Sequence, residues 1–203
     1  FRRVLFRSEI DGKRILSSRE AMTLEEQPKS LAIVGAGAIG VEFAYFFNAF
    51  GTQVTLLEAA GQVLPREDAE VAAVLEAELK EQGIAVETGV GVEAVEGGRT
   101  CTGRYGDGKE IRAEKVLMAV GVRGNTAELG LEALGVRLER GAVAVDGRMQ
   151  TNVDGLYAIG DVTGPPQLAH VAAAEGIAAV EFGAGMERPE LDPAAVQIGR
   201  AHV

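Results

Sequence analysis

Short apolar runs recur along the first part of the chain, and each is separated from the next by a more polar stretch. The runs combine β-branched and small apolar residues with little polar alternation, which is typical of strands buried on both faces of a parallel sheet. We expect four such strands: LAIVG (31–35), QVTLLE (53–58), IAVET (84–88) and VLMAVG (116–121).

Two longer segments between these runs repeat their apolar residues at helical spacing. Residues 38–50 stop at Gly51, and residues 67–82 begin with acidic side chains and stop at Gly83. Acids at the start of a helix and a glycine just after its end are common helix signals. The pattern predicts two helices that each link one parallel strand to the next.

Residues 90–112 alternate apolar and polar positions instead, with GDGK as a hairpin turn. We expect an antiparallel three-stranded meander here, inserted before the strand at 116–121. The predicted fold class is therefore α/β: a Rossmann-like parallel sheet with an inserted meander.

The pattern changes after Gly124, where short elements follow one another. LYAIGD (156–161) predicts an apolar strand, and an alanine-rich helix follows near 169–184. The change predicts part of a second domain. The expected division is a connector at 9–30 with a helix starting at Ser17 or Ser18, a nucleotide-binding domain at 31–124, and a piece of the second domain at 125–196.

The two ends of the chain do not resemble protein sequence. Residues 3–8 and 197–202 can be encoded by the two strands of one DNA duplex, and that duplex resembles a common sequencing adapter. We therefore expect residues 1–8 and 197–203 to be adapter-derived and to contribute nothing to the native fold.

The composition narrows the classes of function. The chain has 203 residues, a formal net charge of −10 and 47% hydrophobic residues. This acidic balance argues against a nucleic-acid or membrane surface, because phosphates would be repelled. One cysteine, Cys101, and two histidines, His170 and His202, exclude a zinc site and a disulfide scaffold. Without a spanning apolar run or a signal peptide, the cytoplasm is the expected compartment.

A glycine-rich turn, GAGAIG, joins the first apolar strand to the helix that follows. Gly35 can make the tight turn, Gly37 can let a pyrophosphate approach the backbone, and Gly40 can let helix and strand touch. The amides of Ala38 and Ile39 then face the phosphates at the positive helix end. The turn predicts a dinucleotide site, with a plain close-packed turn as the alternative.

Two acids follow this turn. Glu58 ends the second strand, where a carboxylate can accept a hydrogen bond from a ribose 2′-hydroxyl and would repel a 2′-phosphate. NAD is therefore favoured over NADP. On spacing alone, Glu42 is an acid of the first helical turn that interacts with the helix dipole.

A second ligand signal lies in residues 151–176. The expected strand ends at Gly160 and Asp161, and a short loop leads into a helix near Leu168 and Ala169. This arrangement offers one carboxylate for a hydroxyl group, and free helix amides for an anion or a carbonyl oxygen. These residues alone leave the ligand unidentified.

Three motifs together carry a resemblance to a known family. They are the G-x-G-x-x-G-x-E turn, AVGVRGNT (119–126), and T-x-x-x-G-x-Y-A-x-G-D followed by LAH and EG. The chain resembles the flavin-dependent pyridine nucleotide–disulfide oxidoreductases over essentially all of 9–197. Within that family it is most similar to the dihydrolipoyl dehydrogenases. The resemblance implies FAD and NAD as cofactors, with the second domain belonging to FAD.

The same resemblance implies a role for individual residues at the flavin. Asp161 would hold the ribityl chain, and the backbone amides of Leu168, Ala169 and His170 would face the pyrimidine edge of the flavin. His170 would therefore position the flavin rather than act as a general base.

At the NAD site the resemblance implies four further positions. Glu42 would lie beside the nicotinamide and the flavin, and Glu58 would bind the adenosine ribose. Val92 would lie near the adenine, and Gly121 against the NAD backbone.

The chain departs from the family pattern in one loop and lacks several of its parts. Where the family commonly has A-x-G-R-x-P-N, this chain has Val122 and Gly124, which we expect to loosen a loop between the domains. The family's FAD fingerprint, its redox cysteine pair and its carboxy-terminal His–Glu base are not in the chain. We therefore expect no catalytic residue in this chain, weak binding of NAD, poor binding of FAD or none, and no turnover of lipoamide.

The resemblance also implies the setting of a full-length parent enzyme. That parent would form a homodimer, dock to a lipoamide-bearing 2-oxo acid dehydrogenase complex, and pass electrons from dihydrolipoamide through FAD to NAD. Mercuric reductase, glutathione reductase and soluble transhydrogenase remain alternatives within the family. A stand-alone nucleotide-binding module remains an alternative outside it.

Overall fold

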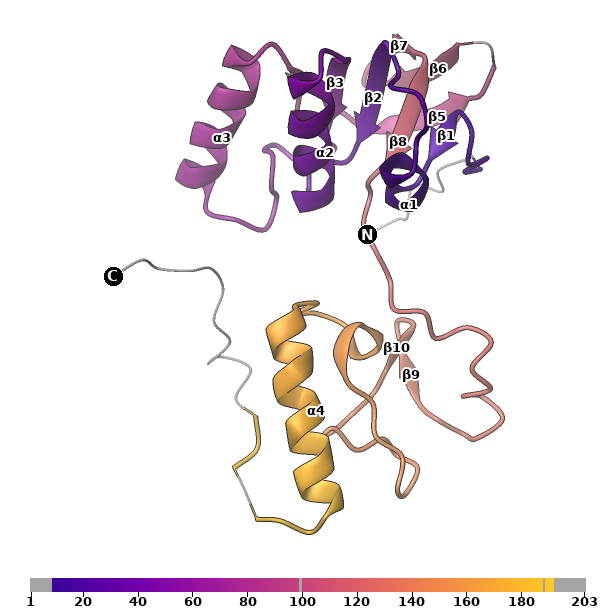
Figure 1. The fold of residues 1–203 in the computed structure, drawn as a ribbon, viewed down its shortest axis with the longest axis vertical. Helices are drawn as coiled ribbons and strands as arrows, with labels where there is room; N and C mark the ends of the chain where they lie inside the picture. Colours follow the sequence, from indigo (N-terminus) through magenta and orange to yellow (C-terminus); the bar gives the residue numbers. More distant parts are fainter. Residues whose placement is uncertain (1–8, 99, 188, 192–203) are drawn as a thin grey trace. The chain divides into compact units, whose positions relative to one another are not determined.

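A computed structural model describes residues 9–98, 100–187 and 189–191. The chain divides into two compact units, and the division falls between Gly121 and Val122, close to Gly124, where the sequence pattern changes (Figure 1). We call them the first unit and the second unit. The terminal segments expected to be adapter-derived lie outside the described residues.

The first unit is built on a parallel sheet with the strand order β1-β8-β2-β3-β4. These strands are Ile15–Leu16 (β1), Lys115–Met118 (β8), Ser30–Val34 (β2), Gln53–Leu57 (β3) and Ala85–Glu87 (β4). Every neighbouring pair is parallel. The α/β fold class and the four strands expected from the apolar runs are therefore confirmed.

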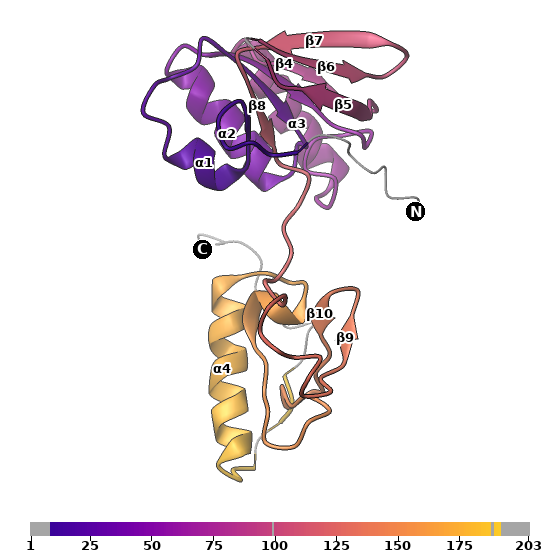
Figure 2. The same ribbon diagram turned by 90° about the vertical axis from the view of Figure 1, so that its right-hand side faces the viewer.

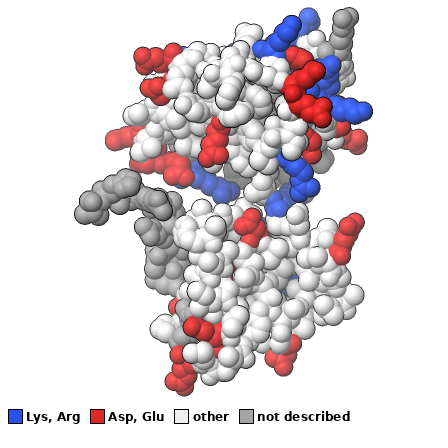
Figure 3. All heavy atoms as spheres, in the orientation of Figure 1, with Lys and Arg blue, Asp and Glu red and all other residues white. Residues whose placement is uncertain are grey.

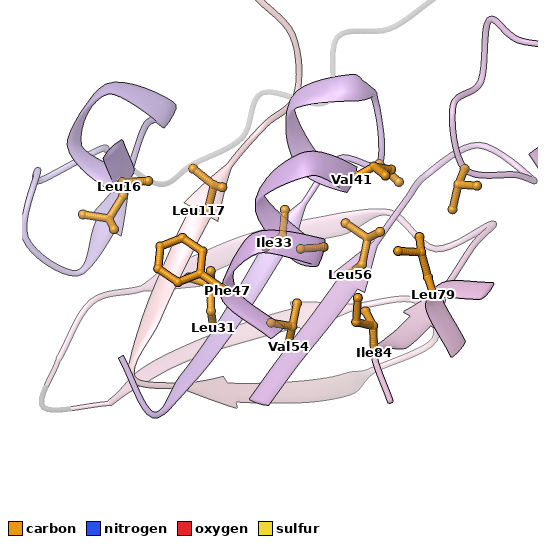
Figure 4. Packing of buried hydrophobic residues seen from close by; sticks show 14 of the residues in the cluster. Leu16, Leu31, Ile33, Val41, Phe47, Val54, Leu56, Leu79, Ile84 and Leu117 are labelled. Atoms are coloured by element: carbon orange, nitrogen blue, oxygen red, sulfur yellow. The ribbon is translucent and has the colours of Figure 1, made fainter. Parts of the chain in front are cut away.

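Helices cover one face of this sheet. Helix α2 (Ala38–Ala49) and helix α3 (Ala69–Glu81) link the parallel strands as expected, and Asp68 caps α3 by accepting the amides of Glu70 and Val71. Figure 4 shows the apolar side chains of the sheet and helices meeting in this layer. Ile33 and Leu56 are completely buried there, and each such side chain contributes about 1.5–3 kcal/mol to folding.

The inserted meander covers the opposite face. It consists of β5 (Val92–Glu96), β6 (Cys101–Tyr105) and β7 (Lys109–Ala113), paired antiparallel in that order. Ala32 and Val34 of β2 pack on this side, while Leu31 and Ile33 pack toward the helices. Alternate residues of a strand point to opposite faces, so the apolar residues 31–34 of β2 fit between two covering layers (Figure 2).

The connector contains one strand that the sequence did not indicate. The helix expected after Ser17 is α1 (Ser18–Met22), with Ser17 and Glu20 forming a capping box. Just before it, β1 joins the sheet as an edge strand, with Ile15 opposite Val116 and Leu16 opposite Leu117. A two-residue strand has no detectable periodicity, and its partner lies far along the chain.

The second unit has little regular sheet. It contains the antiparallel pair β9 (Leu138–Glu139) and β10 (Ala142–Val143), the short 3-10 helix η1 (Gly160–Thr163) and helix α4 (Ala169–Gly183). The alanine-rich helix is confirmed, but the prediction of a strand at 156–161 was wrong. This segment makes an isolated bridge between Tyr157 and Gln150 and then turns into η1.

Residues 156–161 do not form a strand because, among the described residues, no strand lies beside them along their length. A buried parallel strand needs a neighbour along its length, and among the described residues this segment pairs only at the single bridge with Gln150. Its apolar residues are accordingly only partly covered, and Ile159 is 40% exposed. The apolar runs that have a neighbouring strand are therefore buried, whereas this run, which has none along its length, is only partly buried.

No helix in the described part of the chain is long and apolar enough to cross a membrane.

A hydrogen-bonded cluster fastens the meander to the edge of the parallel sheet. The Glu87 carboxylate accepts the Tyr105 hydroxyl at 2.7 Å and the Lys109 ammonium at 2.8 Å. The bonds from Lys109 and then from Tyr105 lower the pKa of Glu87. Burial, followed by the bond to Glu87, raises the pKa of Tyr105. The cluster is therefore most stable with Glu87 ionised and Tyr105 protonated.

Tyr105→Phe tests this cluster. Tyr105 is 6% exposed, so losing its hydroxyl should lower the free energy of unfolding by about 1 kcal/mol at neutral pH. A carboxyl group with a lowered folded-state pKa stabilises the fold above its ordinary pKa, and this contribution is lost as the pH falls through the folded value. The deficit of the variant should therefore shrink at acid pH. Urea unfolding across pH measures it.

Tyr45→Phe is the matched control, because Tyr45 is 56% exposed in the same unit. A deficit of equal size in both variants, or one that stays constant down to acid pH, would contradict the role given to Glu87.

Candidate functional site

The glycine turn lies at the carboxyl edge of the parallel sheet, between β2 and α2. Gly35 has φ +102°, and a Cβ built on it would collide with the carbonyl oxygen of Ala119, just after β8. Its amide donates to the Leu57 carbonyl at 2.8 Å, and the Ala119 amide donates to the Val34 carbonyl at 2.8 Å. The turn is thus pinned between the two strands that neighbour β2.

The other two glycines of the motif differ in their surroundings. A Cβ on Gly40 would collide with the carbonyl oxygen of Gly35 and lie 3.5 Å from the Ala119 side chain. A Cβ on Gly37 would meet nothing within 4 Å. Gly40 therefore permits the helix to pack on the turn, whereas Gly37 leaves its side of the turn open to an approaching group.

The first turn of α2 faces the same edge. Gly37 is the N-cap and supplies no capping side chain to the amides of Ala38 and Ile39. Amides at such a helix end, together with the helix dipole, favour an anion. Glu42 is exposed and belongs to the second turn of α2, since the structure has no acid in the first turn. The interpretation of Glu42 as a first-turn acid was therefore wrong.

Glu58 connects two loops at this edge. One carboxylate oxygen accepts the Ala36 amide at 2.7 Å, and the other accepts the Ala60 amide at 2.8 Å. The glycine turn and the loop after β3 are therefore joined through one side chain. Each oxygen has a second lone pair, so Glu58 can still accept a hydrogen bond from a ligand hydroxyl.

Val92 and Gly121 lie near this edge in different ways. Val92 begins β5 and is 7% exposed, so its side chain offers little surface to a ligand. The backbone before it is tied to the Glu58 loop, with the Val90 amide donating to the Glu58 carbonyl at 2.9 Å. Gly121 is exposed, has φ +116° and has open space where a Cβ would be.

In the second unit, Asp161 lies exposed in η1, and backbone contacts fix the turn around it. A Cβ on Gly124 would lie 2.6 Å from the Asp161 carbonyl oxygen and 2.7 Å from the Val162 Cα. Gly124 was expected to loosen a loop, yet it permits a close backbone contact with this turn. The Thr163 hydroxyl donates to the Gly160 carbonyl at 2.8 Å.

Helix α4 begins close after this turn. Its N-cap, Leu168, makes no side-chain hydrogen bond to the first turn, and Ala169 and His170 are exposed. The Leu168 amide already donates to the Pro166 carbonyl at 3.1 Å. Of the three amides expected to face a ligand, those of Ala169 and His170 therefore belong to the open helix end.

The expected site residues thus form two groups, one in each unit. The first unit brings together the glycine turn, the start of α2, Glu58 and Gly121 at one sheet edge, and the second unit holds Asp161 and the start of α4. The sequence did not indicate that Ala119 contacts the glycine turn or that Gly124 lies against Asp161. Both contacts join residues that are distant in the sequence.

Cys101 does not offer an exposed thiol. The Cys101 side chain is completely buried, and burial followed by the charge of Asp11 raises the pKa of its thiol. Among the described residues, no group of three or more His, Cys, Asp or Glu could hold a metal ion. On the face drawn in Figure 3, the basic side chains of the first unit lie among acidic ones.

Comparisons with known proteins show the family to which the chain belongs. Residues 6–176 match the family described as pyridine nucleotide-disulphide oxidoreductase. Dihydrolipoyl dehydrogenase from Rhizobium etli is 46% identical over 190 residues, covering 91% of this chain and 39% of the relative. The same enzyme from Bacillus subtilis is 40% identical over 202 residues, covering 93% and 41%. The chain therefore spans about two-fifths of the length of these curated relatives.

Solved structures give the same result. LpdA from Mycobacterium tuberculosis superimposes with a TM-score of 0.82 at 35% identity, covering 90% of this chain and 40% of that one. RclA, an HOCl-induced flavoprotein disulfide reductase from Escherichia coli, gives 0.81 at 33% identity, covering 90% and 42%.

Gly40→Ala and Gly37→Ala test the geometry of the turn. Gly40→Ala should lower the free energy of unfolding by about 3 kcal/mol, because the added methyl collides with backbone that cannot move aside. Gly37→Ala should cost only about 0.5–1 kcal/mol, the difference between glycine and alanine at an N-cap. Urea unfolding of both variants measures this contrast, and equal losses would refute it.

Proposed function

Because the chain belongs to the family of pyridine nucleotide-disulphide oxidoreductases, we propose that it is the NAD-binding part and a portion of the FAD-binding part of a dihydrolipoyl dehydrogenase. The observation that carries the proposal is the glycine turn of the first unit, open at Gly37 and joined to Glu58 through Ala36.

The residues of the first unit fit a bound NAD. The open side of Gly37 and the uncapped amides of Ala38 and Ile39 suit a pyrophosphate. Glu58 would accept a hydrogen bond from the adenosine ribose through its remaining lone pairs. Two backbone amides hold its carboxylate, so a 2′-phosphate at this position would be repelled by Glu58.

Three further residues complete the proposed NAD site. The backbone at Val92 would border the adenine, since its side chain is buried and the preceding residues are bonded to the Glu58 loop. Gly121 would let the dinucleotide pass close to the backbone, because no side chain fills that space. Glu42, exposed on α2, would lie beside the nicotinamide, where its charge could orient the ring.

The donor set of the second unit fits one portion of FAD. The exposed Asp161 carboxylate suits a hydroxyl of the ribityl chain, and the amides at the start of α4, at Ala169 and His170, suit the pyrimidine edge of a flavin. When bound, FAD supplies the electron transfer between a dithiol and NAD. Helix amides facing the flavin would stabilise negative charge on it, which is the role we propose for this chain's own groups.

The substrate and partners of the longer enzyme follow from the same proposal. Its relatives are named for dihydrolipoamide oxidation, so we propose lipoamide borne on a 2-oxo acid dehydrogenase complex as the substrate and a homodimer as the working form. The redox cysteine pair and the base would be supplied by parts of the enzyme outside this chain. The cytoplasmic location expected from the sequence stays a prediction.

A disulfide reductase with another substrate is the second candidate, because RclA matches almost as well as LpdA in structure. Mercuric reductase, glutathione reductase and soluble transhydrogenase are the alternatives that the sequence resemblance leaves open, although Glu58 disfavours users of NADPH. The surrounding coding sequence distinguishes them through the spacing of the cysteine pair. A start codon near residue 9 and a stop codon near residue 197 would instead favour a stand-alone module.

Nucleotide titrations test the NAD assignment. We expect the chain to bind NAD at least about tenfold more tightly than NADP, and we expect Glu58→Gln to reduce this preference because the repelling charge is removed. Isothermal titration calorimetry measures both affinities. Glu67→Gln, which removes an exposed acid of the same unit, is the control. A preference for NADP in the unaltered chain would reject the assignment.

An activity assay tests the proposed division of labour. The 203-residue chain should show no NADH-dependent reduction of lipoamide, because Cys101 is its only cysteine and is buried. An active preparation whose activity survives Cys101→Ser would overturn the proposal that the redox disulfide lies elsewhere in a longer enzyme.

A further inference from the structure

One carboxylate in the second unit is directed at a backbone amide of the Asp161 turn. Glu175, a half-buried residue of helix α4, accepts the Gly160 amide at 2.7 Å. Glu175 belongs to the E-G motif of the sequence, for which the proposed function supplies no role.

The turn that this bond holds lies directly against the helix. Gly160 has φ +72°, and a Cβ on it would lie 3.3 Å from the Ala172 side chain. On another side, the backbone at Gly124 fits so closely against Asp161 that a Cβ has no room. The turn is thus confined between α4 and the segment at Gly124, and Glu175 supplies the directional bond.

This arrangement links both parts of the proposed flavin site to one rigid element. The amides of Ala169 and His170 belong to the first turn of α4, and Glu175 lies further along the same helix. Because the Glu175 carboxylate accepts a hydrogen bond from the Gly160 amide, it fixes the position of the next residue, Asp161, relative to those amides. Groups held by supporting hydrogen bonds on rigid elements keep their geometry better than groups on free loops.

We propose that Glu175 is a positioning residue: its bond to the Gly160 amide fixes the Asp161 turn on α4, so that the carboxylate and the helix amides can hold one flavin together. The inference rests on the proposed function for the identity of the ligand. The bond itself is a property of this chain and can be measured without any cofactor.

Three substitutions separate the bond from charge and fold. Glu175→Ala removes the acceptor while keeping a good helix former. Glu175→Asp keeps the charge but shortens the reach, and Glu175→Gln keeps an oxygen at the same reach. Glu132→Ala, an exposed acid of the same unit, controls for loss of one negative charge.

The first measurement is hydrogen exchange of the Gly160 amide by NMR in the full 203-residue chain. Exchange should be about ten- to a hundredfold faster in Glu175→Ala and Glu175→Asp, and near the original rate in Glu175→Gln and Glu132→Ala. Unchanged exchange in both Glu175→Ala and Glu175→Asp would overturn the inference. If Glu175→Ala fails to fold, Glu175→Asp and Glu175→Gln still give the comparison.

The second measurement is titration with FAD, followed through the amide shifts of Asp161, Ala169 and His170. Glu175→Ala and Glu175→Asp should weaken FAD binding by about tenfold, as losses of supporting hydrogen bonds do at other sites, and Glu175→Gln should restore most of it. Faster Gly160 exchange with unchanged FAD affinity would make Glu175 purely structural and overturn positioning.

The two measurements also separate this inference from the proposed function. If FAD shifts no amide of the unaltered chain, this portion of the FAD-binding part does not hold a flavin by itself, which agrees with the absence of the family's FAD fingerprint from the chain. The exchange data then still decide whether Glu175 holds the turn. If FAD binds and the Glu175 variants bind it equally well, the proposed function stands and only the further inference fails.

Discussion

The fold of the first unit depends on close backbone contacts among three segments: the residue that follows β8, the glycine turn, and the start of helix α2. The carbonyl of Ala119 lies against Gly35, and the carbonyl of Gly35 lies against Gly40, so strand, turn and helix approach one another as closely as their atoms allow. Any side chain at Gly35 or Gly40 would force them apart. This close approach places the start of α2 at the sheet edge where Glu58 binds the Ala36 amide.

The second unit uses the same principle with different parts. Gly124 lets two backbone segments meet at Asp161, as Gly35 and Gly40 do in the first unit. A carboxylate then joins backbone to backbone in each unit: Glu58 reaches Ala36 and Ala60, and Glu175 reaches Gly160. Within each unit, glycines permit two backbone segments to approach closely, and an acidic side chain holds one of these segments by accepting hydrogen bonds from its backbone amides. The sequence indicated Asp161, Glu42 and Glu58, whereas the contact of Gly124 and the hydrogen bond of Glu175 are seen only in the structure.

Much of the fold could be predicted because its signals are local. The helix at 38–50, the capped helix at 67–82 and the GDGK hairpin each depend on neighbours within a few residues, and apolar runs indicated the strands. The two-residue β1 could not be predicted, since only its pairing with β8 makes it a strand. LYAIGD was misinterpreted for the related reason that apolar character does not reveal whether a partner strand exists. Of the candidate site, the glycine roles followed from the motif, whereas the contacts of Gly124 and Glu175 join residues distant in sequence.

The lengths of the strands at the two sheet edges have a consequence for a chain that spans only part of its relatives. The outermost strands, β1 and β4, contain two and three residues, and they flank longer strands in the interior. Exposed sheet edges attract strands from other molecules in proportion to the unpaired backbone that they present. With so little backbone exposed at either edge, the parallel sheet is a poor template for intermolecular strand addition, and its edges are protected against aggregation by their own shortness.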